Sequence, residues 1–337
     1  MKKKIKIFDK YVSPKSLKNL KFSFDKDRIN GNLINSDESY QVKDNLAYLV
    51  YPEKLPTQES DIIDWYSNNY EKYDEYLPLT FKTFNENEDE IRNKIIDSIN
   101  IEPHYKILET GAGTGRDSII LASKLDHKGE LHVTDIFDKI LKKSFSKLSD
   151  FKTKIYYSVI NAIYLPFPDN YFDIYYHFGG FNTFSDKKRA FSEINRVVKP
   201  GGKVIVGDES MPSWLRETEF GKILMNSNSH YKFDIPLNYL DVSSRNVTLE
   251  YIIGGVFYII QYTVGEGEPY ADFDFEIPGV RGGTHRTRYY GHLEGVDNET
   301  LKLAKEARSK ANLSMHKWLN KIIKKAALKV LNDKKRN

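Results

Sequence analysis

A short segment with three alternating glycines constrains this chain most: residues Ile107 to Arg116 read Ile-Leu-Glu-Thr-Gly-Ala-Gly-Thr-Gly-Arg. The apolar residues before the glycines indicate a short buried strand, and the amphipathic stretch Asp117 to Ala122 after them indicates a helix. The third glycine comes one residue too early for the Gly-x-Gly-x-x-Gly dinucleotide fingerprint, in which the backbone approaches a pyrophosphate. The tighter turn leaves room for a ribose and an amino-acid chain. Glycine turns are common, so the triplet alone leaves a purely structural turn open.

A second apolar segment, Gly129 to Asp135, ends in an acid and is followed by a helical stretch from Lys139 to Leu148. Asp135 stands about 20 residues beyond the glycine turn, where an acid at a strand end accepts hydrogen bonds from ribose hydroxyl groups in such folds. An aspartate at this position is also a common helix cap. Its register with the glycine turn favours the ribose role.

Two further segments complete an ordered set. Residues Val159 to Asp173 resemble the Asp-Ala-x-x-Leu-Pro-Phe-x-Asp-x-x-Phe-Asp run of one enzyme family, and Ala190 to Val206 resemble its helix, Lys-Pro-Gly-Gly turn and next strand. In that turn the proline ends the helix and the glycines supply positive-φ geometry. Together, the four segments resemble class I S-adenosylmethionine (SAM) dependent methyltransferases of the ubiquinone and menaquinone biosynthesis type, over residues 60–265.

This resemblance implies a fold, a cofactor and a set of contact residues. The expected fold is α/β, a Rossmann-like, seven-stranded, mostly parallel sheet with helices on both faces. The expected cofactor is SAM, which leaves as S-adenosylhomocysteine, and no metal is expected. At position 161 the family's usual acid facing the adenine amine is replaced by Asn, whose side-chain oxygen can still accept from that amine. The residues expected at the cofactor are Glu109, Gly111, Gly113, Gly115, Asp135, Asn161, Ala162 and Phe178.

The methyl acceptor is expected beside the segment Tyr176 to Phe184, at the carboxyl end of the fourth strand. His177 is the obvious base there and could take a proton from an oxygen or nitrogen acceptor near neutral pH. A structural histidine that donates to the backbone is the alternative. The Asn-Pro-Pro-Tyr type of motif used on exocyclic amines of DNA bases is absent. Because the segment is apolar and aromatic, it favours a small, partly apolar O-, N- or C-acceptor.

Composition excludes several classes of protein. The 337 residues include no cysteine, which excludes disulfides, thiolate zinc sites and cysteine nucleophiles, and with them the covalent route of cytosine C5 methylation. No apolar run approaches the ~18–20 residues needed to cross a bilayer. The basic N-terminus has no apolar signal core after it, so the expected location is cytoplasmic.

Charge is distributed unevenly along the chain. Residues 1–30 carry +7 and residues 301–337 carry +10, which leaves −13 for residues 31–300 in a chain of net charge +4. The basic ends could meet nucleic acid, a membrane or the acidic body of the same protein, or form solvated helix faces. An acidic core argues against a nucleic-acid substrate across the active site.

Four domains are expected: a small β-rich module over 1–55, the methyltransferase domain over 56–265, a loop-rich connector over 266–296, and a helical hairpin over 297–337. The first module resembles the end of a zinc-ribbon-like domain without its cysteines, held by its own apolar strands.

Helices are expected at Asn87 to Asn100 and Met211 to Asn226, and an antiparallel strand pair at Asn246 to Val264. The segment 56–100 is rich in aromatic residues, whose rings either line the acceptor pocket or pack a helix onto the sheet. These residues are Trp65, Tyr66, Tyr70, Tyr73 and Tyr76.

The C-terminal segment predicts two helices, Asn298 to Ala311 and Ser314 to Leu331, with Ser314 as an N-cap. The second helix carries an apolar stripe that must pack on something, in the same subunit or in a second copy. Its members are Met315, Trp318, Leu319, Ile322, Ile323, Ala326 and Val330. Residues Glu299 to Ala327 also resemble ribbon-helix-helix proteins, which dimerise and bind DNA through a preceding strand. Arg286 and Arg288 alternate as in such a strand, but they lie too far ahead of the helices.

The favoured function is therefore methyl transfer from SAM to a small acceptor, in a possible homo-oligomer formed through the C-terminal helices. A peptide or protein acceptor is one alternative. A SAM-binding module with an assembly or DNA-binding tail is another, and nucleic acid is not the favoured partner.

Overall fold

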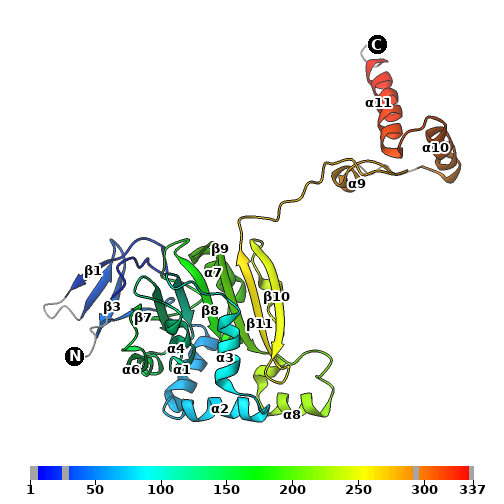
Figure 1. The fold of residues 1–337 in the computed structure, drawn as a ribbon. Helices are drawn as coiled ribbons and strands as arrows, with labels where there is room; N and C mark the ends of the chain where they lie inside the picture. Colours follow the sequence, from blue (N-terminus) through cyan, green and yellow to red (C-terminus); the bar gives the residue numbers. More distant parts are fainter. Residues whose placement is uncertain (1–6, 25–29, 291–295, 334–337) are drawn as a thin grey trace. The chain divides into compact units, whose positions relative to one another are not determined.

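The computed structural model describes residues 7–24, 30–290 and 296–333. The chain divides into two compact units, Met1–Pro269 and Tyr270–Asn337. All strands of the described residues lie in the first unit (Figure 1). No helix within these ranges is both long and apolar enough to cross a membrane.

The centre of the first unit is the predicted seven-stranded sheet, in the order β7-β6-β5-β8-β9-β11-β10. Five neighbouring strands are parallel, and β11 runs antiparallel to both β9 and β10. The strands are β5 (Lys106–Thr110), β6 (Glu130–Asp135), β7 (Lys154–Ile160), β8 (Phe172–Phe178), β9 (Val198–Glu209), β10 (Ser244–Ile252) and β11 (Phe257–Val264). The predicted α/β fold and the predicted antiparallel pair are confirmed.

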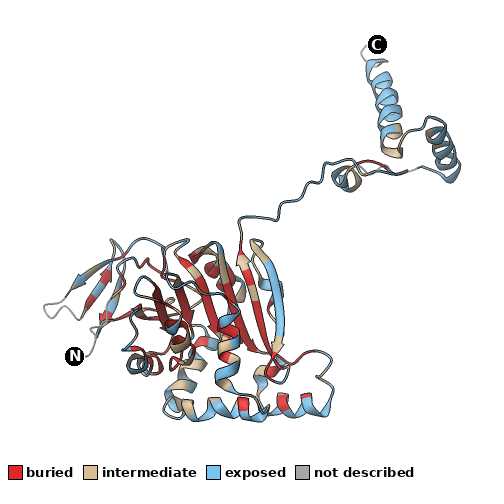
Figure 2. Cartoon of the chain, viewed as in Figure 1, coloured by how far each residue is buried: buried red, intermediate tan, exposed pale blue. Residues whose placement is uncertain are grey.

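Both faces of this sheet are covered, so residues on both faces of its central strands are buried, and all six residues of β6 are among them. Ile107 and Leu108, neighbours on β5, are both fully buried and belong to the cores on opposite faces. Figure 2 shows the central strands of the sheet as mostly buried, whereas the edge strand β10 is largely exposed. The sheet edge at which the parallel strands end is therefore the place where polar groups can meet a ligand.

Helices cover the two faces. The core of one face holds apolar residues of α3 (Glu88–Asp97), α4 (Arg116–Ser123), α5 (Asp138–Lys142) and α6 (Ser144–Leu148), whereas α7 (Lys187–Val197) belongs to the core of the other. The single helix predicted from Lys139 to Leu148 is therefore two short helices that meet at Lys143.

Four additional strands extend the sheet beyond the predicted seven. They are β1 (Lys21–Phe24), β2 (Gly31–Ile34), β3 (Ser39–Lys43) and β4 (Leu46–Leu49). Asp44 and Asn45 join β3 to β4 with positive φ at both positions, as a two-residue hairpin turn requires. Strand β4 then pairs in parallel with β7. The strands predicted in the N-terminal segment thus extend the common sheet, and they do not show a zinc-ribbon-like unit.

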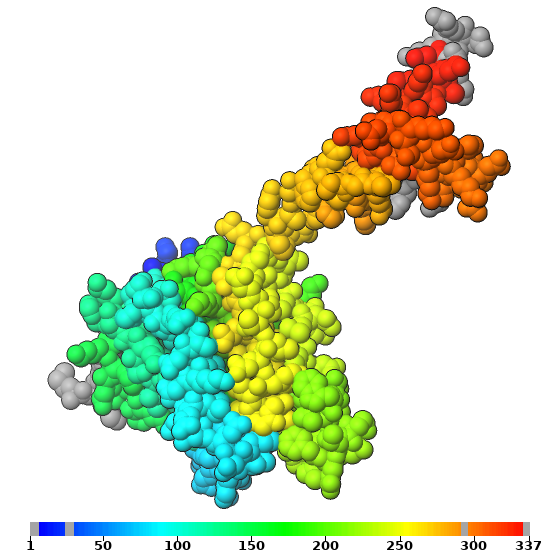
Figure 3. Space-filling view, turned by 45° about the vertical axis from the view of Figure 1, so that its right-hand side comes forward, coloured from blue at the N-terminus to red at the C-terminus, as the bar shows by residue number. Residues whose placement is uncertain are grey.

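Two helices, α1 (Thr57–Asn69) and α2 (Tyr73–Thr83), lie along the edge at which the parallel strands end (Figure 1). The following helix, α3, runs beside β10 and β11, so the cyan and yellow segments lie side by side in Figure 3. Two contacts hold this arrangement: Glu86 accepts from the Gly254 N–H at 2.8 Å, and Lys94 pairs with Glu250 at 2.6 Å.

Between β9 and β10 the chain forms α8 (Glu219–Ser227), η2 (Ser229–Lys232) and η3 (Leu237–Tyr239), and η1 (Phe181–Thr183) follows β8. The helix predicted from Met211 therefore begins only at Glu219. The Thr218 side chain accepts from the Gly221 N–H at 3.0 Å and caps the helix at this point.

The second unit contains α9 (His285–Tyr290), α10 (Asn298–Lys310) and α11 (Met315–Asp333). The bounds of α10 and α11 agree with the predicted hairpin helices, and the Ser314 hydroxyl accepts from the Lys317 N–H at 3.3 Å as an N-cap does. Arg286 and Arg288 lie in α9, so they do not form the strand that their alternation resembled. A ribbon-helix-helix arrangement is not shown by the described residues of this unit.

Candidate cofactor site

The predicted glycine turn follows β5 directly. Gly111, Gly113 and Gly115 have φ values of 65°, 54° and 82°, a region that glycine enters without steric cost. Two of them also lack space for a side chain. A Cβ atom on Gly111 would lie 2.9 Å from His177 Cε1, and one on Gly115 would lie 2.7 Å from Ser144 Cβ. Glycine is therefore required here by backbone conformation and by close packing together.

Asp135, at the end of β6, holds the glycine turn. One carboxylate oxygen accepts from the Gly113 N–H at 2.8 Å, and the other accepts from the Phe137 N–H at 3.0 Å. The side chain is buried, and this burial raises the pKa of Asp135. A carboxylate can accept about four hydrogen bonds, so both oxygens retain capacity for hydroxyl groups of a ligand. The predicted pair of glycine turn and strand-end acid is thus brought into direct contact.

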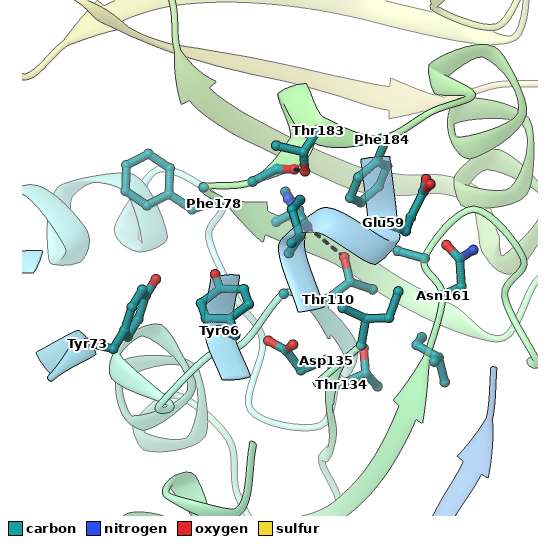
Figure 4. Close-up of a pocket in the computed structure, with 18 residues that line it drawn as sticks. Glu59, Tyr66, Tyr73, Thr110, Thr134, Asp135, Asn161, Phe178, Thr183 and Phe184 are labelled. Carbon is teal, nitrogen blue, oxygen red and sulfur yellow. Dashed lines mark hydrogen bonds between the residues drawn. The ribbon is translucent and has the colours of Figure 1, made fainter. Parts of the chain in front are cut away.

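A cavity opens at this edge of the sheet (Figure 4). Its wall is formed by the ends of the parallel strands, by the loop after β8, and by α1 and α2. Six predicted site residues line it: Gly111, Asp135, Asn161, Ala162, His177 and Phe178. No cluster of three or more His, Asp or Glu side chains that could hold a metal occurs in the described part of the chain.

Three predicted cofactor residues do not line the cavity: Glu109, Gly113 and Gly115. Gly113 and Gly115 shape the turn through their backbone. Glu109 is buried behind it and accepts from the Ser118 hydroxyl at 2.5 Å. Burial and the nearby Asp117 carboxylate raise the pKa of Glu109 well above its usual range. Its position links β5 to α4, so a direct cofactor contact stays a prediction.

Asn161, where the resembled family has an acid, is already engaged at both ends of its amide. The nitrogen donates to the Tyr51 carbonyl at 3.1 Å, and the oxygen accepts from the Ile163 N–H at 3.0 Å. One lone pair of that oxygen remains for a ligand amine. The side chain therefore fixes the loop after β7 against the segment after β4. It retains little capacity to accept a hydrogen bond from adenine, the role that was predicted for it.

His177 lies on β8 with its ring almost fully buried. Its Nδ1 atom is 2.9 Å from the Thr110 hydroxyl, which is 2.6 Å from the Tyr175 hydroxyl, and its Nε2 atom has no hydrogen-bond partner among the described residues. Phe181 and Phe184 contact the ring edge-to-face. Burial lowers the pKa of His177 to about 4. The ring is thus neutral at pH 7, and a base of this strength is poorly matched to proton abstraction near neutrality.

The aromatic residues of α1 and α2 divide between the two predicted roles. Tyr66 and Tyr73 line the cavity, whereas Trp65 and Tyr76 are exposed. Next to Tyr73, Asp74 accepts from the Thr114 hydroxyl at 2.6 Å and pairs with Arg116 at 3.2 Å. These bonds fix α2 to the glycine turn and place the Tyr73 ring over the cavity.

Sequence reasoning missed Glu59, in the first turn of α1. It is 5% exposed and lines the cavity. One carboxylate oxygen accepts from the N–H and the hydroxyl of Ser185, at 2.9 and 2.6 Å. Acids are common in the first turn of a helix because the helix dipole stabilises a negative charge there. The position of Glu59 in the sequence therefore did not indicate a role in the site. The contact with Ser185 joins residues 126 positions apart, which no local pattern reveals.

Comparison with known proteins adds one family and a set of relatives. The chain is 39% identical over 112 residues to the ubiquinone/menaquinone biosynthesis C-methyltransferase UbiE of Shewanella oneidensis. That match covers 33% of this chain and 45% of the relative, so the chain spans less than half of the curated relatives it matches.

Two solved structures share 14–15% identity with the chain. Phosphoethanolamine N-methyltransferase 2 of Haemonchus contortus, in complex with SAM, has 14% identity and a TM-score of 0.47, over 64% of this chain and 62% of that one. A putative methyltransferase of Bacillus halodurans has 15% identity and a TM-score of 0.42, over 52% of this chain and 98% of that one. The ubiE/COQ5 methyltransferase family model matches residues 56–226, just over half of the chain, and the protein belongs to that family.

Proposed function

We propose that this protein transfers the methyl group of SAM to a small, partly apolar acceptor and releases S-adenosylhomocysteine. The observation that carries the proposal is the contact of Asp135 with the Gly113 N–H at the rim of the cavity. It joins a strand-end carboxylate to a glycine turn at the edge where open α/β sheets bind ligands. Membership of the ubiE/COQ5 family supports the same reaction.

The residues of the cavity fit this cofactor. A ribose beside Asp135 can donate its hydroxyl hydrogens to the carboxylate. Gly111 lines the cavity and has no room for a side chain, because a Cβ atom there would meet His177. Apolar walls at Ile136 and Ile160 suit the flat faces of a base. SAM supplies a methyl group already activated on a sulfonium, so the protein has to align the acceptor and exclude water.

In this proposal, Tyr66 and Tyr73 exclude water from the cavity. Both rings lie over the cavity, and α2, which carries Tyr73, is fixed to the glycine turn through Asp74. Phe178, at the end of β8, offers an apolar wall to the acceptor. The reacting atom of the acceptor is an oxygen, a nitrogen or a carbon, and the C-methyltransferase relatives favour carbon.

We assign His177 a positioning role rather than that of a general base. Its low pKa and its bond to Thr110 support this assignment. In this role the ring packs closely against Gly111 and forms part of the cavity wall.

We also propose that the C-terminal helices dock on a methyltransferase domain, of the same or a neighbouring subunit, with residues 266–296 as connector. Within their own unit, the side chains of α11 from Lys321 to Asn332 are exposed, including Ile322 and Ile323 of the apolar stripe. An exposed apolar stripe of this kind marks an association site.

Binding of S-adenosylhomocysteine, measured by calorimetry, tests the cofactor assignment. Asp135→Ala should weaken binding by about 1.5–3 kcal/mol, because a charged hydrogen-bond acceptor is removed. Gly111→Val should abolish binding, because its side chain meets His177 at a positive-φ position. Asp138→Ala is the matched control, since Asp138 pairs with Lys142 and does not line the cavity.

Unchanged affinity in both site variants would refute the assignment. Turnover is measured separately, by mixing the protein with SAM labelled in its methyl group and a cell extract. Label in small molecules supports the proposed reaction, label in polypeptides supports a protein acceptor, and binding without transfer supports a SAM-binding module.

A further inference from the structure

Glu59 lines the cavity and carries one polar atom that no described residue satisfies. Its Oε1 atom accepts both hydrogen bonds from Ser185, whereas Oε2 is buried and has no partner within the described part of the chain. Burial of a carboxylate oxygen without a hydrogen bond is unfavourable. Because the side chain lines the cavity, a bound ligand can satisfy it.

The ligand group must be a hydrogen-bond donor, since a carboxylate oxygen only accepts. The nearest cation of the loop does not take this role. Lys187 donates to the carbonyl oxygens of Asn182 and Phe184, at 2.8 and 3.1 Å. Glu59 therefore selects for an N–H or O–H group in whatever fills the cavity.

The position of Glu59 along the cavity identifies that group. In Figure 4, Glu59 lies beside Asn161 and Phe184 on one side, Tyr73 and Phe178 lie on the other, and Asp135 lies between them. The Tyr73 side is that of the glycine turn, since a Cβ on Gly113 would lie 3.6 Å from the Tyr73 ring. With the ribose at Asp135 and the amino-acid chain toward the glycine turn, the base extends toward Glu59.

We propose that Glu59 Oε2 accepts a hydrogen bond from the exocyclic amine of the adenine base, an inference that rests on the proposed function. Asn161, the residue expected in this role, uses its amide on Tyr51 and Ile163. The carboxylate that binds the base therefore comes from α1 instead of from the end of β7. The two hydrogen bonds from Ser185 hold it in place. The same side chain then holds α1 against the loop after β8 and recognises the base.

Glu59→Gln separates these roles. The Ser185 N–H can bond only to the amide oxygen, so the Gln oxygen takes the place of Oε1 and its NH₂ group faces the cavity. The hydrogen bonds from Ser185 are kept, while the atom facing the ligand changes from an acceptor to a donor. Asp61→Asn, on the exposed face of the same helix, is the matched control. Ser185→Ala removes the hydrogen bond from the Ser185 hydroxyl to Oε1 without changing Oε2.

The measurement is calorimetry with two ligands, S-adenosylhomocysteine and S-inosylhomocysteine, in which a carbonyl oxygen replaces the amine. The parent should prefer the adenosyl ligand by about tenfold or more. Glu59→Gln should reverse this preference, because its NH₂ group can donate to the carbonyl, and both control variants should keep the preference of the parent.

Equal affinity of the parent for the two ligands overturns the inference whether or not any variant folds. An unaltered preference in a folded Glu59→Gln protein overturns it too, and so does an effect confined to the KM of the methyl acceptor. Failure of the parent to bind either ligand contradicts the proposed function instead, so the two failures are distinguishable.

Discussion

Residues 1–55 and 297–337 were both predicted to form domains of their own beside the methyltransferase domain. In the structure, the strands of the first segment join the central sheet, whereas the second segment belongs to a separate unit. In the N-terminal segment, Leu33, Val42, Leu46 and Leu49 are almost completely buried, and their strands continue the sheet. In the C-terminal unit, Leu303 and Val330 are 61% and 59% exposed within their own unit.

This difference follows from how strands and helices satisfy their backbones. A strand at a sheet edge leaves N–H and C=O groups unpaired, so β4 gains hydrogen bonds as well as apolar contacts by joining β7. A helix satisfies its own backbone and needs a partner only for its apolar stripe. The N-terminal strands are therefore built into the core, whereas α10 and α11 leave apolar side chains exposed within their own unit.

The largest expected effect tests this contrast in stability. Leu49→Ala in β4 should lower the free energy of unfolding of the first unit by about 2–5 kcal/mol, because it leaves a cavity in a fully buried position. Leu303→Ala in α10 should change it by less than about 0.5 kcal/mol. Urea unfolding followed by tryptophan fluorescence measures both variants.

A Trp318→Phe background confines the signal to Trp65 and Trp214 of the first unit. A small effect of Leu49→Ala would show that the N-terminal strands are dispensable to the core, and the contrast between the two ends would fail.

Much of the central fold could be predicted because its signals are local. The buried strands β8 and β9 contain short apolar runs, and the conformations of Gly111, Gly113 and Gly115 demand glycine. The meeting of the glycine turn with Asp135 followed from strand order. The pairing of β4 with β7 has no such signal, since any unpaired edge offers the same backbone groups to a strand.

The site was less predictable where its contacts are distant in sequence. Glu59 reaches the cavity through Ser185, and Asn161 is occupied by Tyr51, which precedes it by 110 positions. The sequence shows that Asn161 has a side-chain oxygen that could accept a hydrogen bond from a ligand. It does not show that neighbouring groups already form hydrogen bonds with that side chain. The pKa of His177 likewise depends on burial by Phe181 and Phe184, which no spacing rule reports.

A second prediction uses pH, because the buried histidines lie in the first unit and neither His285 nor His316 of the second is buried. The folded pKa of His177 is about 4, against about 6.5 in an unfolded chain, so the unfolded state binds more protons between these values. The contribution of His177 to stability is full above pH 6.5 and decreases as pH falls to 4. At one pKa unit per 1.36 kcal/mol, the loss is at most about 3 kcal/mol.

His177→Asn removes this dependence, so the stability of the variant should fall less than that of the parent between pH 6.5 and 4. Thermal unfolding of the first unit across this range provides the measurement. The difference between variant and parent is the useful quantity, because burial raises the pKa of Asp135 and Glu109 and their contributions have the opposite sign. His127→Asn, an exposed histidine, is the control. Parallel pH profiles for His177→Asn and the parent would contradict the burial of an uncharged ring.

The smallest expected effect on the site comes from the C-terminal unit. Removal of residues 297–337 should leave the affinity for S-adenosylhomocysteine unchanged, because all the residues that line the cavity belong to the first unit. The same deletion should change the oligomeric state or the solubility, because it uncovers the surface on which the stripe of α11 docks. Calorimetry and light scattering measure the two parts.

Two single substitutions separate the stripe from the rest of the helix. Ile322 and Leu328 are 43% and 48% exposed, but only Ile322 belongs to the apolar stripe. Ile322→Lys should therefore reproduce the effect of the deletion, whereas Leu328→Lys, on the opposite face, should not. If the hairpin is protease-labile in the full-length protein and neither its removal nor Ile322→Lys changes the scattering, α10 and α11 are a free arm. The lysines of α11 would then be available to nucleic acid, and DNA binding would replace docking as the explanation of the basic C-terminal charge.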